Sequence, residues 1–405
     1  MLLAIVSVAT VLLLTACGGA SESKGTKDQP ATSGATEANG TTGAPSGAVT
    51  EIKQTSGFLG LIGSIPDSVH NRAWVQVNDY RRFREAFDIQ LPGSEADEDA
   101  LMEYLLRPID MPQFFGSFIS GYGQFASQAL ERRRYLGFDL RDVHRGGEVG
   151  FPPQVLEVLQ GDFDPGVTAQ ALAACAECEP HEESERAGIK FYSWGEDLRL
   201  EIEKIFAPPA YDNLGRGSHI AVQTNQVFRS LELAGMRSLI DTSLGRQDSL
   251  AEVEQFRLLA AGLDELNAYG GLFTDQTQSM DQILADIGTF TQEAQAALKS
   301  RLEMEPLLLP YDAFATGAGR DSQGQYMAVV LVHPSERSAR RNVELLRRRI
   351  EEAQSMWTNE PWSKFFDEME IRSEGAVLLG KLRGERTRSL WIQFIFQRDP
   401  LLLHE

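Results

Sequence analysis

A polar tract over residues 18–50 confines the folded part of this chain to the residues that follow it. The tract contains no Ile, Leu or aromatic residue, and 25 of its 33 residues are Gly, Ala, Ser, Thr or Pro. Such a composition cannot bury enough apolar surface to offset the entropy lost on ordering. We therefore expect a flexible linker with a mean end-to-end distance of about 30 Å, followed by a folded body over residues 51–405.

An apolar run precedes the linker and ends at a cysteine. Residues 2–14 are apolar apart from one Ser and one Thr. This length suits the central region of a secretory signal, because a membrane-spanning helix needs about 20 apolar residues. The run closes on Leu14-Thr15-Ala16-Cys17, which resembles the lipobox of bacterial lipoprotein precursors.

The resemblance implies where the protein works. It implies a signal peptide over residues 1–16, cleavage before Cys17, acyl chains such as palmitate on the Cys17 sulfur, and a lipid-anchored linker over residues 17–50. Membrane lipid is then a partner, and the body is held at the extracytoplasmic side of the cell membrane or cell envelope. Two or three acyl chains anchor a protein stably, whereas one chain anchors it only marginally.

The charge of the chain restricts its other partners. The formal net charge is −20, and nucleic-acid binding needs clustered positive charge, so we expect no nucleic-acid partner. The 355 residues of the body are enough for two domains. After the signal, no segment is long and apolar enough to cross a bilayer.

The order of strand and helix patterns predicts an α+β fold. We expect two units of mostly antiparallel sheet covered by helices. The first unit is expected over 51–235, and a long helical pair over 236–310 followed by an α+β unit over 311–405 makes the second domain. Within this scheme we predict a hairpin over 219–222 and 226–230, a capping box at Ser249 and Glu252, helices over 249–266 and 278–302, and strands over 136–140, 326–332, 376–382 and 390–396.

Cys175 and Cys178 are the strongest local chemical signal in the body. An oxidising extracytoplasmic space favours a small disulfide between them; two free thiols, or a metal or redox site, remain as alternatives. A zinc site needs about four ligands, whereas the pair and His181 supply three. The neighbouring glutamates raise the thiol pKa, which disfavours redox chemistry.

Three other groups of residues have both a structural and a functional interpretation. Asp162 and Asp164 fit a turn with a helix cap better than a calcium loop. An arginine run fits a solvated helix face, paired with Glu four residues away, better than a site for an anionic polymer or lipid headgroups. An aromatic group fits core packing better than a ligand groove. The run is Arg337, Arg340, Arg341, Arg347, Arg348 and Arg349, and the aromatic group is Trp357, Trp362, Phe365 and Phe366.

The sequence contains no pattern typical of an enzyme. Its six histidines are scattered, and the His-Glu-x-x-His and Gly-x-Ser-x-Gly patterns are both absent. We expect no cofactor and no metal. The leading hypothesis is a non-catalytic binding or structural protein of the cell envelope, with an envelope protein or a small molecule as an unidentified further partner. The alternatives are a solute-binding lipoprotein of an ABC-type uptake system and an envelope hydrolase whose site is dispersed in the sequence.

Overall fold

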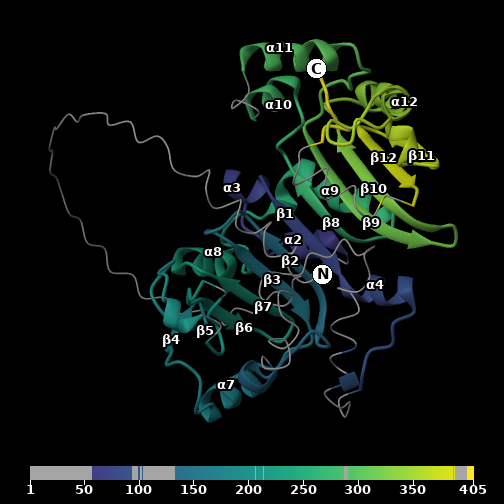
Figure 1. Cartoon of the computed structure of the whole chain (residues 1–405). Coiled ribbons are helices and arrows are strands. Elements are labelled where there is room, and N and C mark those ends of the chain that lie inside the picture. Colours follow the sequence, from purple (N-terminus) through teal and green to yellow (C-terminus); the bar gives the residue numbers. More distant parts are fainter. Residues whose placement is uncertain are drawn as a thin grey trace, which may run out of the picture. The chain divides into compact units, whose positions relative to one another are not determined.

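The computed structural model describes residues 57–93, 99–100, 103, 133–205, 207–212, 214–286, 291–385, 387 and 399–405 (Figure 1). Cys17, the apolar run and the linker lie outside these residues. So do the predicted strand over 390–396 and most of a helix predicted over 95–106. Among the described residues, no helix is both long and apolar enough to span a membrane.

Within the described residues, twelve strands form one sheet, in the order β11-β12-β10-β9-β8-β1-β2-β3-β7-β6-β5-β4. Neighbouring strands are antiparallel throughout, which confirms the α+β class and the antiparallel sheet. The strands of both expected units belong to this sheet, and β1 joins them by pairing with β8. The strands are β1 (Val75–Asp79), β2 (Val143–Val149), β3 (Leu156–Gly161), β4 (Glu182–Arg186), β5 (Ile189–Ser193), β6 (His219–Val222), β7 (Gln226–Ser230), β8 (Ala268–Thr274), β9 (Ala313–Asp321), β10 (Gly324–Val332), β11 (Glu368–Glu374) and β12 (Val377–Arg383).

Helices cover both faces of the sheet. Side chains alternate between the two faces along each strand, so one strand can contribute apolar side chains to a core on either face. In β10, Ala328 and Val330 belong to the core on one face, whereas Val329 and Leu331 belong to the core on the other. The helices are α2 (Phe58–Ile62), α3 (Val69–Arg72), α4 (Tyr80–Phe87), α7 (Pro165–Ala174), α8 (Leu233–Ser243), α9 (Glu254–Glu265), α10 (Met280–Asp286), α11 (Gln292–Glu303) and α12 (Glu336–Glu352), with short 3₁₀ turns η1 (Ile202–Lys204), η2 (Leu250–Glu252) and η3 (Trp362–Lys364).

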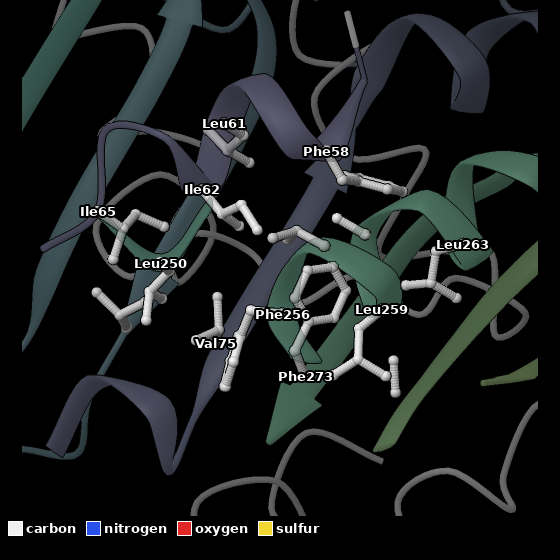
Figure 2. Packing of buried hydrophobic residues seen from close by; sticks show 14 of the residues in the cluster. Phe58, Leu61, Ile62, Ile65, Val75, Leu250, Phe256, Leu259, Leu263 and Phe273 are labelled. Carbon is white, nitrogen blue, oxygen red and sulfur yellow. The ribbon is translucent and has the colours of Figure 1, made fainter. Parts of the chain in front are cut away.

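The largest core lies under α2, α8 and α9 and extends across strands from β6 to β12. Phe58 of α2 and Phe256 of α9 are fully buried, and the Phe58 ring meets the edge of Phe273 in β8 at 6.3 Å between centroids. Figure 2 shows these side chains and Val75 of β1 within one cluster of buried hydrophobic residues. The predicted capping box at Ser249 and Glu252 is present, and it starts η2 just before α9.

Two smaller cores fill the opposite face. One packs α12, η3 and the last residues of the chain against β9, β10 and β12. The other packs α7 and the loops beside it against β3, β6 and β7. The outer strands of the sheet are acidic, with Glu182, Glu183 and Glu185 exposed on β4. Charged edge strands resist pairing with other chains.

A strand interrupts the helical region predicted over 236–310. The two predicted helices were expected to follow one another, but β8 lies between α9 and α10 and occupies the middle of the sheet. All seven residues of β8 are buried, so the strand lacks the alternation of apolar and polar residues on which the prediction relied. The region also contains α8, and its second helix is divided into α10 and α11.

The strand predicted over 136–140 is also wrong. Residues 133–136 are helical, and Gly137 then turns the chain with φ of +80°. Leu136, Phe138 and Leu140 are nevertheless buried in the core beside α7. Their alternating pattern therefore reflects burial of a loop rather than a strand.

Helix α9 approaches the sheet closely because glycine lines the surface beneath it. A Cβ atom on Gly271 of β8 would lie 2.5 Å from Leu263 Cδ1 and 2.9 Å from the backbone oxygen of Thr316. A Cβ atom on Gly317 of β9 would lie 2.6 Å from the Gly270 oxygen and 3.1 Å from Leu263 Cδ2. Leu263 thus occupies the volume that two side chains would otherwise fill.

Replacement of Gly271 by alanine should destabilise the body. The added methyl group must displace Leu263 or the strand backbone, and overpacking of this kind costs about 1–3 kcal/mol. The measurement is the urea midpoint of Gly271→Ala. Gly93→Ala is the matched control, because a Cβ there meets nothing within 4 Å. Equal midpoints for the two variants would contradict the close approach of α9.

Candidate functional site

The two cysteines of the body form a disulfide at the end of α7. The Cys175 and Cys178 sulfurs are 2.05 Å apart, and Cys175 is the C-cap of the helix. The His181 ring packs against Tyr192 and Trp194, with centroids 5.3 and 5.4 Å away. Within the described part of the chain, no group of three or more His, Cys, Asp or Glu could hold a metal ion. The disulfide between Cys175 and Cys178 therefore closes a local loop at the end of α7.

Asp164 is the N-cap of α7, as predicted. Its side chain accepts hydrogen bonds from the backbone N–H groups of Gly166 and Val167, and Pro165 occupies the first turn. Asp162 Oδ2 instead lies 3.0 Å from His144 Nε2, and burial lowers the pKa of this imidazole. The two carboxylates thus have separate partners and do not converge as cation ligands.

A hollow of about 390 Å³ lies between α7 and the loops beside it. Aromatic and aliphatic side chains share its lining with three carboxylates that already have partners. Asp142, for example, accepts a hydrogen bond from the Asp139 N–H at 2.9 Å and pairs with Arg133 at 3.4 Å. The lining residues are Arg133, Gly137, Phe138, Asp142, Asp162, Phe163, Asp164, Val167 and Thr224.

The arginine run on α12 is only partly a solvated face. Arg348 pairs with Glu352 at 3.1 Å, as predicted, whereas Arg340 pairs with Glu336 instead of Glu344. Arg347 pairs with Glu344 at 3.6 Å rather than with Glu351. The exposed members of the run are Arg337, Arg340, Arg341 and Arg348.

Arg349 contradicts the prediction of a solvated face, because it is fully buried. Its guanidinium donates to the backbone oxygens of Leu401 at 2.8 Å, Pro400 at 2.7 Å and Pro306 at 2.8 Å, and it pairs with Glu305 at 3.2 Å. Burial lowers the pKa of Arg349. Arg349 therefore fixes the end of the chain beside α12 (Figure 1).

The aromatic group predicted for the core is divided between core and surface. Trp362, Phe365 and Phe366 are buried against α12 and β12, as predicted. Trp357 is 57% exposed, which the spacing of the four residues does not indicate. These residues form no ligand groove with one another.

His333 is buried in a fixed neutral form. The Asn342 amide nitrogen donates to His333 Nε2 at 2.8 Å, and the orientation of this amide is set by two hydrogen bonds to the Leu309 backbone. Protonation of Nε2 would place two donors against each other. Burial lowers the pKa of His333 to about 4, so the imidazole is neutral at pH 7.

His219 belongs to a constellation that the sequence analysis missed. Its Nδ1 lies 2.7 Å from the Ser193 hydroxyl, and its Nε2 lies 2.8 Å from Asp197 Oδ1. Ser193 ends β5 and His219 begins β6, and the two residues face each other in the sheet register. We refer to Ser193, His219 and Asp197 together as the Ser–His–Asp series.

Backbone structure holds each member of the Ser–His–Asp series in place. The second oxygen of Asp197 accepts the Leu233 N–H at 3.0 Å, at the first residue of α8. Only 6% of the His219 side chain is exposed, compared with 46% of the Asp197 side chain, and Ser193 is half-buried. The imidazole is thus enclosed, while the two outer members of the series reach the surface.

The arrangement has the hydrogen-bond order needed for an activated serine. If the Nε2 proton is donated to Asp197, Nδ1 is free to accept the hydroxyl proton of Ser193. No sequence motif links these residues, because Ser193 and Asp197 are separated from His219 by the long β5–β6 connection. The predicted strand over 219–222 is present and pairs with β5, but only the register of this pair reveals the series.

Comparison with known proteins does not identify the chain. No protein-family model matches it, and no curated protein matches it. Solved structures of TP0453 in crystal forms III and I align with TM-scores of 0.39 and 0.37, at 9% and 10% sequence identity. The alignments cover 83% of this chain and 98% and 97% of the TP0453 chains. With TM-scores this low, the likeness carries no inference about function.

Substitution of Arg349 by methionine should be strongly destabilising. It would leave Glu305 without its buried partner and remove the donors to three backbone oxygens, and breaking a buried pair in this way costs about 3–5 kcal/mol. Arg348→Met is the matched control on the same helix, because its exposed ion pair contributes only about 0–1 kcal/mol. Denaturant unfolding checks both variants, and similar losses would contradict the role of Arg349.

His333 should make stability depend on pH. Its folded pKa of about 4 lies below the unfolded value near 6.5, so the unfolded chain binds more protons between these values. The stabilisation is present above about pH 6.5 and is lost as pH falls toward about 4, with a slope of up to about 1.4 kcal/mol per pH unit. Urea unfolding from pH 7.5 to 4.5 should give a flatter curve for His333→Gln; parallel curves would exclude this contribution.

Proposed function

We propose that this chain is a lipid-anchored extracytoplasmic protein of the cell envelope whose folded body has a binding or structural role. The observation that carries the proposal is Leu14-Thr15-Ala16-Cys17 at the end of an apolar run. Acylation of Cys17 would tether the body to a membrane through the polar tract that follows. The described body begins at Gly57, and 39 residues, 18 to 56, separate it from Cys17.

The organisation of the body supports a tethered module. The acidic edge strands limit pairing with other sheets, and the large cores on both faces give a body that folds around its own sheet. The disulfide at the end of α7 suits an oxidising space outside the cytoplasm.

In this proposal, a small molecule binds in the hollow beside α7. Its volume of about 390 Å³ falls within the range of about 300–1,000 Å³ typical of small-molecule pockets. Phe138, Phe163 and Val167 provide apolar lining, and Arg133 provides a positive charge. Asp142, Asp162 and Asp164 outnumber Arg133 in the lining, and Arg133 is itself paired with Asp142. The lining therefore favours a small ligand with an apolar part and a polar or cationic group.

The structure favours this proposal over a transporter's solute-binding protein. That alternative predicts two lobes of parallel sheet with a polar cleft between them. The named strands instead pair antiparallel in one sheet, so no specific observation supports the alternative.

The anchor can be tested on the protein extracted from membranes of its own host. We expect the wild-type chain to fractionate with membranes and to have the mass of residues 17–405 plus acyl chains. Native mass spectrometry of the same sample should show whether a small molecule is retained. Cys17→Ala should remove the acyl mass and release the protein from the membrane.

The matched control is the double substitution Cys175→Ser and Cys178→Ser, which leaves Cys17 in place. We expect this variant to keep the acyl mass and to remain with the membrane. If Cys17→Ala leaves both the intact mass and the membrane fraction unchanged, the anchor is excluded. If lipid is present but no small molecule is retained, the anchor stands and the binding role of the hollow loses its support.

A further inference from the structure

We propose that Ser193, His219 and Asp197 form a catalytic site that hydrolyses carboxylic esters. The observation that carries the proposal is the Ser–His–Asp series, with 2.7 Å between Ser193 Oγ and His219 Nδ1 and 2.8 Å between His219 Nε2 and Asp197 Oδ1. Both distances are those of strong hydrogen bonds. The proposal goes beyond the anchoring role and does not depend on acylation of Cys17.

Each side chain has a defined task in this site. Ser193 is the nucleophile, because its hydroxyl is half-buried rather than enclosed. His219 is the general base, and its burial protects the proton transfer from bulk water. Asp197 orients the imidazole and stabilises the imidazolium that forms when Nδ1 takes the proton.

The carboxylate of Asp197 is held for this task by the start of α8. The Leu233 N–H donates to Asp197 Oδ2 at 3.0 Å, so Oδ1 is directed to His219. The N-terminus of a helix favours a nearby carboxylate, and the Leu233 N–H there fixes the position of the Asp197 carboxyl group. The backbone N–H of Leu233, and not the three side chains alone, therefore sets the order of hydrogen bonds along the Ser–His–Asp series.

The reaction proceeds in two balanced halves. Ser193 Oγ attacks the ester carbonyl carbon while its proton passes to His219 Nδ1, and the tetrahedral intermediate then collapses. The alcohol leaves with the proton from Nδ1, and the acyl group remains on Ser193. Water attacks this acyl group, gives a proton to Nδ1, and releases the carboxylic acid as the proton returns to Ser193 Oγ.

The loop that follows Ser193 indicates the class of substrate. The loop folds back on Gly195, two residues after Ser193, since a Cβ on Gly195 would lie 3.4 Å from Glu201 Oε2 and 3.2 Å from the Tyr211 hydroxyl. Leu200 and Ile202 of this loop are 62% and 76% exposed. Exposed aliphatic side chains favour esters with an apolar acyl or alcohol group.

The charge of the same loop narrows the class of ester substrate further. Asp197 is 46% exposed on its side chain, and Glu196 and Glu203 are exposed nearby in sequence. This excess of carboxylates would repel an anionic ester. We therefore assign the site to neutral, apolar carboxylic esters.

The test uses the full-length protein in detergent with two probes. A fluorophosphonate, which phosphonylates activated serines, should add its mass to the peptide that contains Ser193, and p-nitrophenyl butyrate should be hydrolysed. Ser193→Ala should abolish the adduct and lower ester turnover by about 10⁶-fold. Asp197→Asn retains an oxygen for the Leu233 N–H, and it should lower turnover by about 10⁴-fold.

Ser230→Ala is the matched control, because Ser230 faces His219 from β7 in the same register row but donates its hydroxyl to the Glu232 backbone oxygen. We expect this variant to keep the adduct and the turnover. The proposal is overturned if wild-type protein gains no adduct on Ser193 at saturating fluorophosphonate, or if its ester turnover equals that of Ser193→Ala. The presence or absence of the Ser193 adduct on wild-type protein tests the proposal even if a variant fails to fold.

Discussion

The structure depends on the close approach of α9 to the middle of the sheet. Leu263 packs over Gly271 and Gly317, where added side chains would clash with it or with the strand backbone. This contact lies where β8 and β1 join the strands that come from the two ends of the body. A helix seated over that junction lets α2, α8 and α9 share one core.

Residue patterns were sufficient for several elements that have a clear local signal. The hairpin of β6 and β7, the strand β10, the capping box and the cap at Asp164 all have such a signal, and each is present. Patterns failed for β8 and for the segment around Gly137. Strand β8 is buried on both faces, and the loop around Gly137 buries alternating side chains without being a strand. Arg349 stands next to Arg348 in the run but has Ala353 rather than a glutamate four residues later, and only the folded chain places backbone oxygens around it.

The candidate functional residues could likewise be predicted from the sequence only where they lie close together in it. Cys175 and Cys178 are close in sequence, so their pairing could be anticipated. Ser193 and His219 are paired by the strand register. Asp197 contacts His219 with one carboxylate oxygen and accepts the Leu233 N–H at the start of α8 with the other. Register is set by the whole sheet rather than by nearby residues. A scan for short motifs therefore could not reveal this constellation, whereas the disulfide required only a spacing of three.

The burial of residues 401–403 couples two segments that are far apart in the sequence. Leu401, Leu402 and Leu403 are fully buried, and Arg349 donates to the backbone oxygens of Pro400 and Leu401. Arg349 and Leu401 are 52 positions apart, so the hydrogen bonds of this guanidinium are complete only when the later segment has packed against α12. A variant in which this segment is displaced would leave a charged group among apolar side chains without those acceptors.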